Sequence, residues 1–473
     1  MVKFILNNET IESDLSAGTT VLDFVRYHKN LKGTKIGCRE GDCGACTILV
    51  GEINNESIKY RSMTSCLMPL ANANGKHIVT VEGINKPNNE LTEVQRAMVD
   101  ESGTQCGFCT VGFVMSLTAF CLDETEKSCE MAISSIDGNI CRCTGYKSIE
   151  RAAKRVSGQW SVVSGQKNSE NSLDVAIKKG VVPNYFSEIK EKLIQLKQET
   201  DRPPTTDHRP LFISGGTDLY VQRPEEMVRA LAENLFDDSA LRGISEIDDY
   251  IEIGASAVVT DLFESEIINK IFPNLYKHLK LVSSTPIRNM ATLAGNFVNA
   301  SPIGDMTVWF LALNASIVFN NNREIPLREL YLGYKTLAKS ENEFIKMIRF
   351  RKDVQHFNFE KVCKRTFLDI ASVNTAISLK SEPPGVAGGL SVIIEAHVSA
   401  GGVAPIPLYL QKTSEFLRGK KIFGETIAEA NKILQTEISP ISDVRGAADY
   451  KRLLLRQLFT AHFVELFGWQ PKK

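Results

Sequence analysis

The most informative stretch of the sequence is Gly37-Cys-Arg-Glu-Gly-Asp-Cys-Gly-Ala-Cys46, which is followed later by Cys66. Its cysteines stand as C-x4-C-x2-C, the spacing of a plant-type [2Fe–2S] site. Each of the two irons takes two soft thiolates, so one tight loop has to carry three of the ligands. The glycines of the loop, Gly37, Gly41 and Gly44, allow the backbone to wrap a cluster and to aim amide N–H groups at its sulfurs. We therefore predict a [2Fe–2S] cluster on Cys38, Cys43, Cys46 and Cys66. Packed apolar thiols or a zinc site are the alternatives, although zinc sites usually show two C-x2-C pairs.

A second cysteine group lies farther along the chain. Cys106-Gly-Phe-Cys109 precedes a predicted helix that begins near Val111, and Cys141-Arg-Cys143 lies just before another helix. The positive end of a helix dipole favours thiolates, so two cysteine pairs at helix ends predict a second [2Fe–2S] site. Its ligands would be Cys106, Cys109, Cys141 and Cys143. A C-x2-C pair with a C-x-C pair can also bind zinc, and this alternative stays open for the second group.

The other cysteines carry no motif. Ten of the eleven cysteines precede residue 144, and only Cys363 follows it. Cys121, Cys129 and Cys363 fall outside both groups and are best explained as packed thiols. We therefore expect the cysteine chemistry to be confined to the N-terminal third of the chain.

Hydrophobic periodicity divides this third into two small domains. Apolar runs at 2–6, 47–50 and 77–81 predict strands around one helix at 20–29, which suits a β-grasp domain over residues 1–84. The pattern then changes to helices, at 92–100, 111–122, 130–136 and 147–155, and predicts a four-helix bundle over residues 85–156. Residues 157–180 are predicted to be a linker, because 156–171 are rich in Ser, Gly, Gln and Asn and have no apolar period. Two larger domains are expected over residues 181–350 and 351–473.

Composition limits the possible functions. The chain has 473 residues, too many for one hydrophobic core, and a formal charge of -1 from 55 basic and 56 acidic residues. It lacks the cationic excess that binds nucleic acid or an anionic membrane. It also shows no signal segment and no apolar stretch of roughly 18 residues, the length needed to span a bilayer. HExxH, P-loop, GxGxxG and GxSxG motifs are absent. We expect a cytoplasmic protein with neither nucleic acid nor membrane as partner, in a reducing compartment where cysteine clusters favour metals over disulfides.

Three later segments suggest a nucleotide cofactor. Residues 212–218, Phe-Ile-Ser-Gly-Gly-Thr-Asp, predict a strand running into a loop whose amides could cradle a pyrophosphate, although alone the pattern fits a tight turn better. Pro286-Ile-Arg-Asn-Met-Ala-Thr-Leu-Ala-Gly-Asn296 and Ala300-Ser-Pro-Ile-Gly-Asp305 follow it. The three together are much more specific than any one of them.

These motifs resemble the iron–sulfur and FAD part of the molybdenum hydroxylases, in particular the small subunit of the xanthine dehydrogenase type. The matching strings are residues 37–46, Gln105-Cys-Gly-Phe-Cys-Thr-Val-Gly112, Asn139-Ile-Cys-Arg-Cys-Thr-Gly-Tyr146 and the three later segments. The resemblance covers nearly the whole chain and implies an α+β multidomain fold. Its parts would be a β-grasp [2Fe–2S] ferredoxin domain, a four-helix [2Fe–2S] bundle domain, a two-subdomain α+β FAD-binding domain of the PCMH/VAO type, and a C-terminal α/β flavoprotein domain like that of CO dehydrogenase.

The resemblance also assigns flavin contacts by matching position. The pyrophosphate and ribityl of FAD would be held by Phe212, Ile213, Ser214, Gly215, Gly216, Thr217 and Asp218. The rest of the dinucleotide would be held by Thr292, Asn296 and Asp305. Lys361 and Asp369 match a Lys and an Asp that approach the flavin, with a solvated charged strand as the alternative. Ala294 stands where relatives often have Gly, which adds a methyl in a close-packed loop. The segments Ala400-Gly-Gly-Val-Ala-Pro405 and Asp443-Val-Arg-Gly-Ala-Ala-Asp-Tyr450 resemble the C-terminal domain and are assigned to architecture.

The function that the resemblance implies is electron transfer, with no catalytic residue on this chain. A molybdenum cofactor would hydroxylate a purine, hypoxanthine or xanthine, and electrons would pass through the Cys106 cluster, the Cys38 cluster and FAD to NAD+. The flavin is needed because a [2Fe–2S] cluster moves one electron at a time and hydride chemistry moves two. The 473 residues leave no room for the molybdenum domain of relatives, so a large molybdopterin-binding partner subunit is expected, in a heterodimer that pairs into a dimer of heterodimers.

Three alternatives remain at this point. The same role could serve a molybdenum hydroxylase for an aldehyde or another N-heterocycle, because nothing in this chain touches the substrate. The chain could also be a free-standing iron–sulfur flavoprotein electron carrier with several partners. A zinc-stabilised scaffold without redox function would require both cysteine groups to hold zinc.

Overall fold

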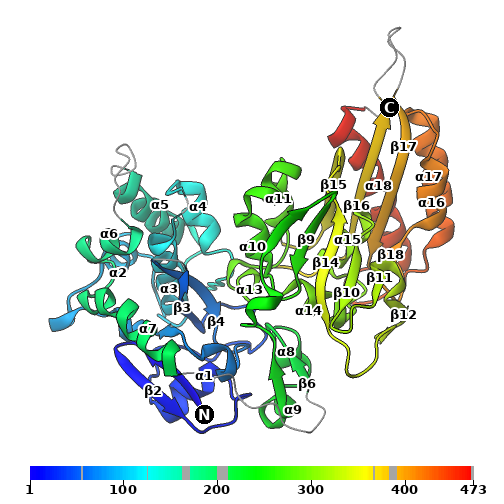
Figure 1. Ribbon diagram of the computed structural model, residues 1–473. Coiled ribbons are helices and arrows are strands. Elements are labelled where there is room, and N and C mark those ends of the chain that lie inside the picture. Colours follow the sequence, from blue (N-terminus) through cyan, green and yellow to red (C-terminus); the bar gives the residue numbers. More distant parts are fainter. Residues whose placement is uncertain are drawn as a thin grey trace. The chain divides into compact units, whose positions relative to one another are not determined.

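The computed structural model describes residues 1–54, 57–124, 126–161, 171–199, 211–365, 368–382 and 391–469. It divides into two compact units (Figure 1). Unit 1 comprises Met1–Phe236 together with Ser284–Ala291, and unit 2 comprises Asp237–Ser283 together with Thr292–Lys473.

Unit 1 begins with a five-stranded sheet in the order β2-β1-β5-β3-β4. The strands are β1 (Val2–Leu6), β2 (Glu9–Ser13), β3 (Thr47–Asn54), β4 (Ser57–Thr64) and β5 (His77–Val79). Strands β1 and β5 are parallel and the other pairs are antiparallel. Against the sheet lies the predicted helix, which forms as α1 (Val21–Asp23) and the wider turn η1 (Phe24–His28), and Thr20 caps it by accepting a hydrogen bond from the Asp23 amide. One helix across a mixed sheet is the β-grasp arrangement.

Four helices follow, as the periodicity predicts. They are α2 (Glu93–Asp100), α3 (Thr110–Leu122), α4 (Cys129–Ser135) and α5 (Lys147–Ser161). Thr92 and Gln95 form a capping box that begins α2. Helix α3 is buried from Gly112 to Leu122, because α2, α4 and α5 cover one side and strands β3 and β4 cover the other. The bundle and the sheet therefore share one hydrophobic core in unit 1.

The rest of unit 1 packs around these two domains. Its helices and turns are η2 (Leu70–Ala73), η3 (Val81–Ile84), η4 (Pro87–Asn89), α6 (Ser172–Lys178), η5 (Asn184–Glu188), α7 (Ile189–Glu199), α8 (Leu219–Gln222), α9 (Pro224–Arg229) and α13 (Thr285–Arg288), with the parallel strands β6 (Leu211–Ile213) and β7 (Ala232–Asn234). Helix α5 continues to Ser161 because Val156 and Trp160 face the core, and α6 is helical too, so parts of the predicted linker 157–180 are helices. Residues 162–170 of that linker lie outside the described residues.

Unit 2 contains a first sheet in the order β11-β10-β14-β9-β8, all antiparallel. Its strands are β8 (Ile244–Ile247), β9 (Tyr250–Gly254), β10 (Ser316–Phe319), β11 (Glu324–Pro326) and β14 (Ile345–Arg351). The neighbouring elements are η6 (Ser239–Leu241), α10 (Val259–Glu264), α11 (Glu266–Ile271), α12 (Leu275–Leu279), α14 (Leu293–Asn299), α15 (Asp305–Ala312), η7 (Leu327–Glu329) and the hairpin β12 (Tyr331–Gly333) with β13 (Thr336–Leu337).

A second antiparallel sheet completes unit 2. It runs β15 (His356–Val362), β16 (Val373–Glu382), β17 (Val392–Gly401), β18 (Leu408–Tyr409), and α16 (Gln411–Leu417), α17 (Gly424–Glu437) and α18 (Ala448–Phe467) follow. Helix α18 packs on β15 and β16, and α15 packs on β16 and β17. Because α15 lies in this position, its residues from Met306 to Ala312 are all buried. The α+β multidomain fold predicted from the sequence is confirmed.

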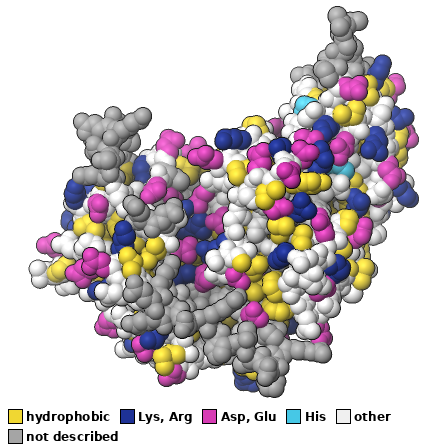
Figure 2. Space-filling view, viewed as in Figure 1, with side chains coloured by type: hydrophobic (Ala, Val, Ile, Leu, Met, Phe, Trp, Pro, Cys, Tyr) yellow, Lys and Arg dark blue, Asp and Glu magenta, His cyan; other side chains and the backbone are white. Residues whose placement is uncertain are grey.

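The surface carries charges of both signs. On the face drawn in Figure 2, Lys and Arg side chains alternate with Asp and Glu side chains, in agreement with the formal charge of -1. Among the described residues, no helix combines the length and the hydrophobicity that crossing a membrane requires.

Candidate iron–sulfur and flavin sites

The first cysteine group lies in the loop between η1 and β3, with Cys66 just after β4. Gly41 and Gly44 adopt φ values of 80° and 66°, the left-handed region that favours glycine. A Cβ on Gly37 would stand 2.5 Å from the Cys43 Sγ, so this position also requires glycine. Backbone amides point at sulfur: the Glu40 and Cys43 amides donate to the Cys38 Sγ at 3.3 and 3.4 Å. The loop thus surrounds its thiols with amides, as the sequence predicts.

The four thiols of this group form two pairs. The hydrogen bond with Cys43 lowers the pKa of the Cys38 thiol to about 5 and raises the pKa of Cys43. In the same way, the hydrogen bond between Cys46 and Cys66 lowers the pKa of Cys46 and raises that of Cys66. Two pairs of adjacent thiols are what two irons with two thiolate ligands each require.

The second group is also brought together as two pairs. Cys109 caps the start of α3, and Cys141 and Cys143 lie in the turn before α5. The Cys143 and Cys106 sulfurs are 3.6 Å apart. Burial and then the hydrogen bond with Cys141 raise the pKa of Cys109 to about 12. Cys141 has polar neighbours, since the Thr144 amide donates to its Sγ at 3.5 Å and its own amide donates to the Tyr146 hydroxyl at 3.1 Å.

The two groups differ in exposure. Cys46 and Cys66 are buried, with 2% and 4% of their surface exposed, whereas Cys106 and Cys143 are both exposed. Phe108 and Tyr146, which neighbour the second group in sequence, are exposed aromatics at 46% and 38%. Of the other four thiols, Cys38, Cys43 and Cys109 are half-buried and Cys141 is buried, so the fully exposed thiols of the two groups both belong to the second.

The pairing of the thiols bears on which metal group they could hold. A tetrahedral zinc ion takes three or four ligands around one point. Thiols arranged two by two, with backbone amides donating to sulfur, fit a [2Fe–2S] cluster better. The assignment of the eight individual ligands stays a prediction.

Part of the predicted flavin site lies in unit 1. Phe212 and Ile213 belong to β6, and the loop from Ser214 to Thr217 leads into α8, whose first turn follows Asp218. Gly216 adopts a φ of 76°, and a Cβ there would stand 3.0 Å from the Tyr220 ring. The Ser214 carbonyl accepts a hydrogen bond from Asn72 at 3.1 Å, so this loop is fastened to the β-grasp domain.

The other predicted flavin residues lie in unit 2. Thr292 caps α14 through a hydrogen bond from the Gly295 amide, and the Asn296 Oδ1 accepts hydrogen bonds from the amide and the hydroxyl of Thr307, each at 3.1 Å. Asp305 begins α15 and forms an ion pair with Lys361 at 2.7 Å. The side chain of Lys361 is only 1% exposed. Asp305 and Lys361, 56 residues apart, are thus brought together.

Asp369 behaves differently from these residues. Its carboxylate forms an ion pair with Arg365 at 2.8 Å and lies on the exposed connection after β15. Hydrogen bonds from Arg365 hold the pKa of Asp369 below its usual range against the opposing effect of burial. The structure therefore joins two of the three charged flavin candidates of unit 2, and it gives Asp369 a local partner.

Two residues that sequence reasoning missed hold these candidates in place. Asn374 is fully buried in β16 and donates to the second Asp305 oxygen at 2.6 Å, so both carboxylate oxygens are bound. A Cβ on Gly401 would stand 2.2 Å from the Asn374 Oδ1, which explains one glycine of the Ala400-Gly-Gly segment. Asn72, also buried, fastens Ser214. No local motif marks either asparagine, because its role depends on a partner far away in sequence.

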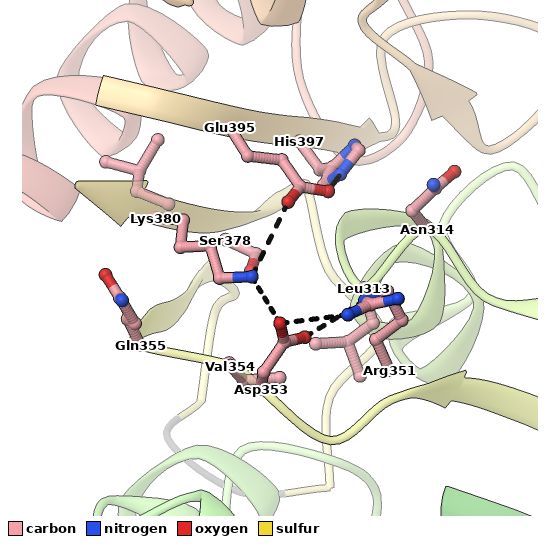
Figure 3. Close-up of a pocket in the computed structure, with 11 residues that line it drawn as sticks. Leu313, Asn314, Arg351, Asp353, Val354, Gln355, Ser378, Lys380, Glu395 and His397 are labelled. Atoms are coloured by element: carbon pink, nitrogen blue, oxygen red, sulfur yellow. Dashed lines mark hydrogen bonds and ion pairs between the residues drawn. The ribbon is translucent and has the colours of Figure 1, made fainter. Parts of the chain in front are cut away.

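A hollow in unit 2 contains none of the predicted cofactor residues. It is lined by Leu313, Asn314, Arg351, Asp353, Val354, Gln355, Ser378, Leu379, Lys380, Glu395 and His397 (Figure 3). Figure 3 shows Lys380 between Asp353 and Glu395, and Arg351 is paired with Asp353 at 3.2 Å. These charged side chains form ion pairs with one another and connect the β14–β15 loop to β16 and β17. We therefore interpret the hollow as a structural feature.

Four family models match the chain in succession. Residues 4–71 match a 2Fe-2S iron-sulfur cluster binding domain, and residues 80–154 match a [2Fe-2S] binding domain. Residues 189–350 match the FAD binding domain in molybdopterin dehydrogenase, and residues 359–466 match the CO dehydrogenase flavoprotein C-terminal domain. The chain therefore has two [2Fe–2S]-binding domains and one FAD-binding domain, the iron–sulfur and flavin architecture of the molybdenum hydroxylases.

The chain is also similar to individual proteins. The chain is 30% identical over 486 residues to the xanthine dehydrogenase of Emericella nidulans, and 25% identical over 531 residues to aldehyde oxidase 4 of Rattus norvegicus. These alignments include 89% and 99% of this chain but only 35% and 39% of the two relatives. A solved carbon monoxide dehydrogenase from Hydrogenophaga pseudoflava, which lacks the Mo-pyranopterin moiety, is 24% identical with a TM-score of 0.49, over 55% of this chain and 90% of that one.

Proposed function

We propose that this chain is the iron–sulfur and FAD electron-transfer subunit of a molybdenum hydroxylase of the xanthine dehydrogenase type. The observation that carries the proposal is the arrangement of eight thiols as two groups of two pairs, on the same chain as an FAD-binding domain. Cys38, Cys43, Cys46 and Cys66 hold one [2Fe–2S] cluster, and Cys106, Cys109, Cys141 and Cys143 hold the other. When bound, the clusters carry single electrons and the flavin exchanges one or two.

The exposure of the thiols supports a direction for the electrons. Cys106 and Cys143 stand at the surface, and the exposed rings of Phe108 and Tyr146 lie nearby in sequence. Exposed aromatic residues are enriched where one protein docks on another. We infer that the donor, a molybdenum cofactor on a large partner subunit, delivers electrons to this group first. The buried Cys46 and Cys66 then belong to the cluster nearer to the flavin.

We infer the flavin contacts for each unit by itself. In unit 1, the loop from Ser214 to Thr217 contributes backbone amides for the pyrophosphate, and Gly216 leaves room for it. In unit 2, Lys361 and Asp305 form a buried ion pair. Charged groups near a bound flavin tune its electronic properties. Thr292 and Asn296 hold the rest of the dinucleotide, and Asp369 approaches the flavin.

The substrate and the final acceptor belong to the proposal as well. We propose purine hydroxylation on the partner, from hypoxanthine or xanthine to urate, and NAD+ as the acceptor, because the xanthine dehydrogenase of Emericella nidulans is 30% identical to this chain. We propose that the molybdenum cofactor lies on a large partner subunit, with which the iron–sulfur and flavin domains of this chain exchange electrons. An aldehyde as substrate is the second candidate, since an aldehyde oxidase matches over 99% of the chain.

One experiment tests the proposal in two stages. The purified chain should contain about four irons and about four acid-labile sulfides, the content of two [2Fe–2S] clusters, with one FAD. NADH added without oxygen should then bleach the absorption of the flavin and of both clusters, because electrons can also pass from NADH to the flavin and on to the clusters. Stoichiometric zinc in place of iron contradicts the whole proposal. Full cofactor content without any reduction by NADH contradicts only the NAD+ step.

A further inference from the structure

Among the residues of unit 1 that the structure describes, one backbone hydrogen bond joins the two cysteine groups. The Ile140 amide donates to the Cys43 carbonyl at 3.1 Å. Cys43 belongs to the first group, and Ile140 directly precedes Cys141 of the second. A continuous path from one thiol-bearing residue to the other therefore contains one peptide bond and one hydrogen bond, although the two residues lie in different domains.

Both polar atoms of the Asn139 side-chain amide form hydrogen bonds at this junction. Its Nδ2 donates to the Gly44 carbonyl at 3.1 Å, and its Oδ1 accepts from the Ser116 hydroxyl at 2.8 Å. Asn139 is 4% exposed and Ser116 is fully buried, so water does not compete for these hydrogen bonds. Asn139 thus holds together the loop of the first cysteine group, helix α3 and the segment that carries Cys141.

Glycines make the close approach possible. A Cβ on Gly112, in α3, would stand 2.1 Å from the Gly44 carbonyl oxygen. A Cβ on Gly44 would stand 2.4 Å from both the Asn139 Nδ2 and the Gly138 carbonyl oxygen. The backbones approach this closely only because Gly44 and Gly112 lack side chains.

We propose that Asn139 is a positioning residue for electron transfer between the two cysteine groups. It keeps the Ile140 amide on the Cys43 carbonyl, so that the two thiolate sets stay connected through covalent bonds and one short hydrogen bond. One electron leaves the cluster on the exposed thiols and enters the cluster on the buried thiols, and no proton or bond moves with it. The inference rests on the proposed function, because it requires both clusters to be present.

The test compares two asparagines in the same unit. Asn289 is also 4% exposed, and its Nδ2 donates to the Ser62 carbonyl at 2.8 Å, but it touches neither cysteine group through that bond. Asn139→Ala and Asn289→Ala should each lower the melting temperature, because each leaves a buried partner without its hydrogen bond. Iron content and both electron paramagnetic resonance signals should be retained in each variant, which keeps the proposed function testable on its own.

The deciding measurement is the rate of electron transfer between the clusters. A photosensitised one-electron donor reduces the cluster on Cys106, Cys109, Cys141 and Cys143. Freeze-quenched spectra then follow the reduction of the cluster on Cys38, Cys43, Cys46 and Cys66. Asn139→Ala should slow this step, while Asn289→Ala should leave it at the wild-type rate. Equal rates in the two variants overturn the proposal. If Asn139→Ala does not fold, Ser116→Ala removes only the bond to Oδ1 and should slow the step less; a wild-type rate in that variant overturns the proposal too.

Discussion

The two cysteine groups carry the same number of thiols in different surroundings. Cys46 and Cys66 contribute to the core of the β-grasp domain, whereas Cys106 and Cys143 lie exposed near the ends of helices. The ligand chemistry is the same, so burial and hydrogen bonding to sulfur are what can make the two clusters behave differently. Burial makes the first group part of the fold, and exposure makes the second group accessible to partners and reagents.

The largest expected effect comes from removing one thiol of each group. Cys46→Ser and Cys143→Ser should each abolish one electron paramagnetic resonance signal and leave the other, because the thiols pair within their own groups. Cys46→Ser should also lower thermal stability, since a buried hydroxyl without a partner costs about 1–3 kcal/mol beyond the loss of the cluster. Cys143→Ser should cost less in stability. Loss of both signals from either substitution contradicts separate sites.

The next effect is a difference in accessibility. When the isolated chain is incubated with an iron chelator, the signal of the second cluster should fade first, because Cys106 and Cys143 are exposed. A large partner that covers these thiols should slow the loss, since ligands that bind only the folded site protect it. Absorption and resonance spectra taken over time check both statements. Simultaneous loss of the two signals would show that burial does not control their lability.

The same contrast explains why the cysteine groups could be predicted from the sequence. Three ligands of the first group lie on one loop, and the pairs of the second group are two and three residues apart, so local spacing carries the information. Helices and strands with clear periodicity, such as α3, were likewise predictable. The predicted helix at 20–29 forms as α1 followed by the wider turn η1. Part of the predicted linker 157–180 is helical, because the packing of Val156 and Trp160 extends α5 to Ser161.

Contacts between distant residues could not be predicted in this way. Asn139 meets Gly44 across 95 residues and Asn374 meets Asp305 across 69, and no short motif records either pair. Pro286 to Ala291, the first part of the predicted flavin segment 286–296, pack in unit 1, where Arg288 forms a buried ion pair with Asp137 at 2.7 Å. The local sequence shows which chemical groups a residue offers, but only the folded structure shows which distant residue it contacts.

A medium effect is expected at the junction between the two groups. Gly112→Ala places a methyl 2.1 Å from the Gly44 carbonyl oxygen, and such overpacking costs about 1–3 kcal/mol. Gly158, in helix α5, is the matched control, because nothing lies within 4 Å of a Cβ built there. Gly158→Ala should stabilise the chain by up to about 1 kcal/mol, the helix propensity of Ala over Gly. Chemical denaturation of both variants checks the opposite signs; destabilisation of equal size in both would show that the junction is loose.

The smallest effect separates the two iron–sulfur domains by their response to acid. His77 is fully buried in β5, where its Nε2 donates to the Asn7 carbonyl at 2.7 Å and its Nδ1 lies 2.8 Å from the Tyr60 hydroxyl. Burial lowers the pKa of His77 from 6.5 to about 3. The helical bundle contains no histidine at all. Only the β-grasp domain should therefore lose stability in mild acid.

The sign follows from where the proton binds. Below pH 6.5 His77 is protonated in the unfolded chain but stays neutral in the folded chain. The free energy of unfolding therefore has its largest value above pH 6.5 and decreases as the pH falls toward 3. Between pH 8 and pH 6 the loss should be roughly 1 kcal/mol. His77→Gln removes the titrating group and should flatten this slope in the β-grasp domain, as measured by hydrogen exchange of β1 and β5. His28→Gln, which replaces an exposed histidine of the same domain, is the matched control variant. A slope that persists in His77→Gln would mean that another group in this domain controls its acid sensitivity.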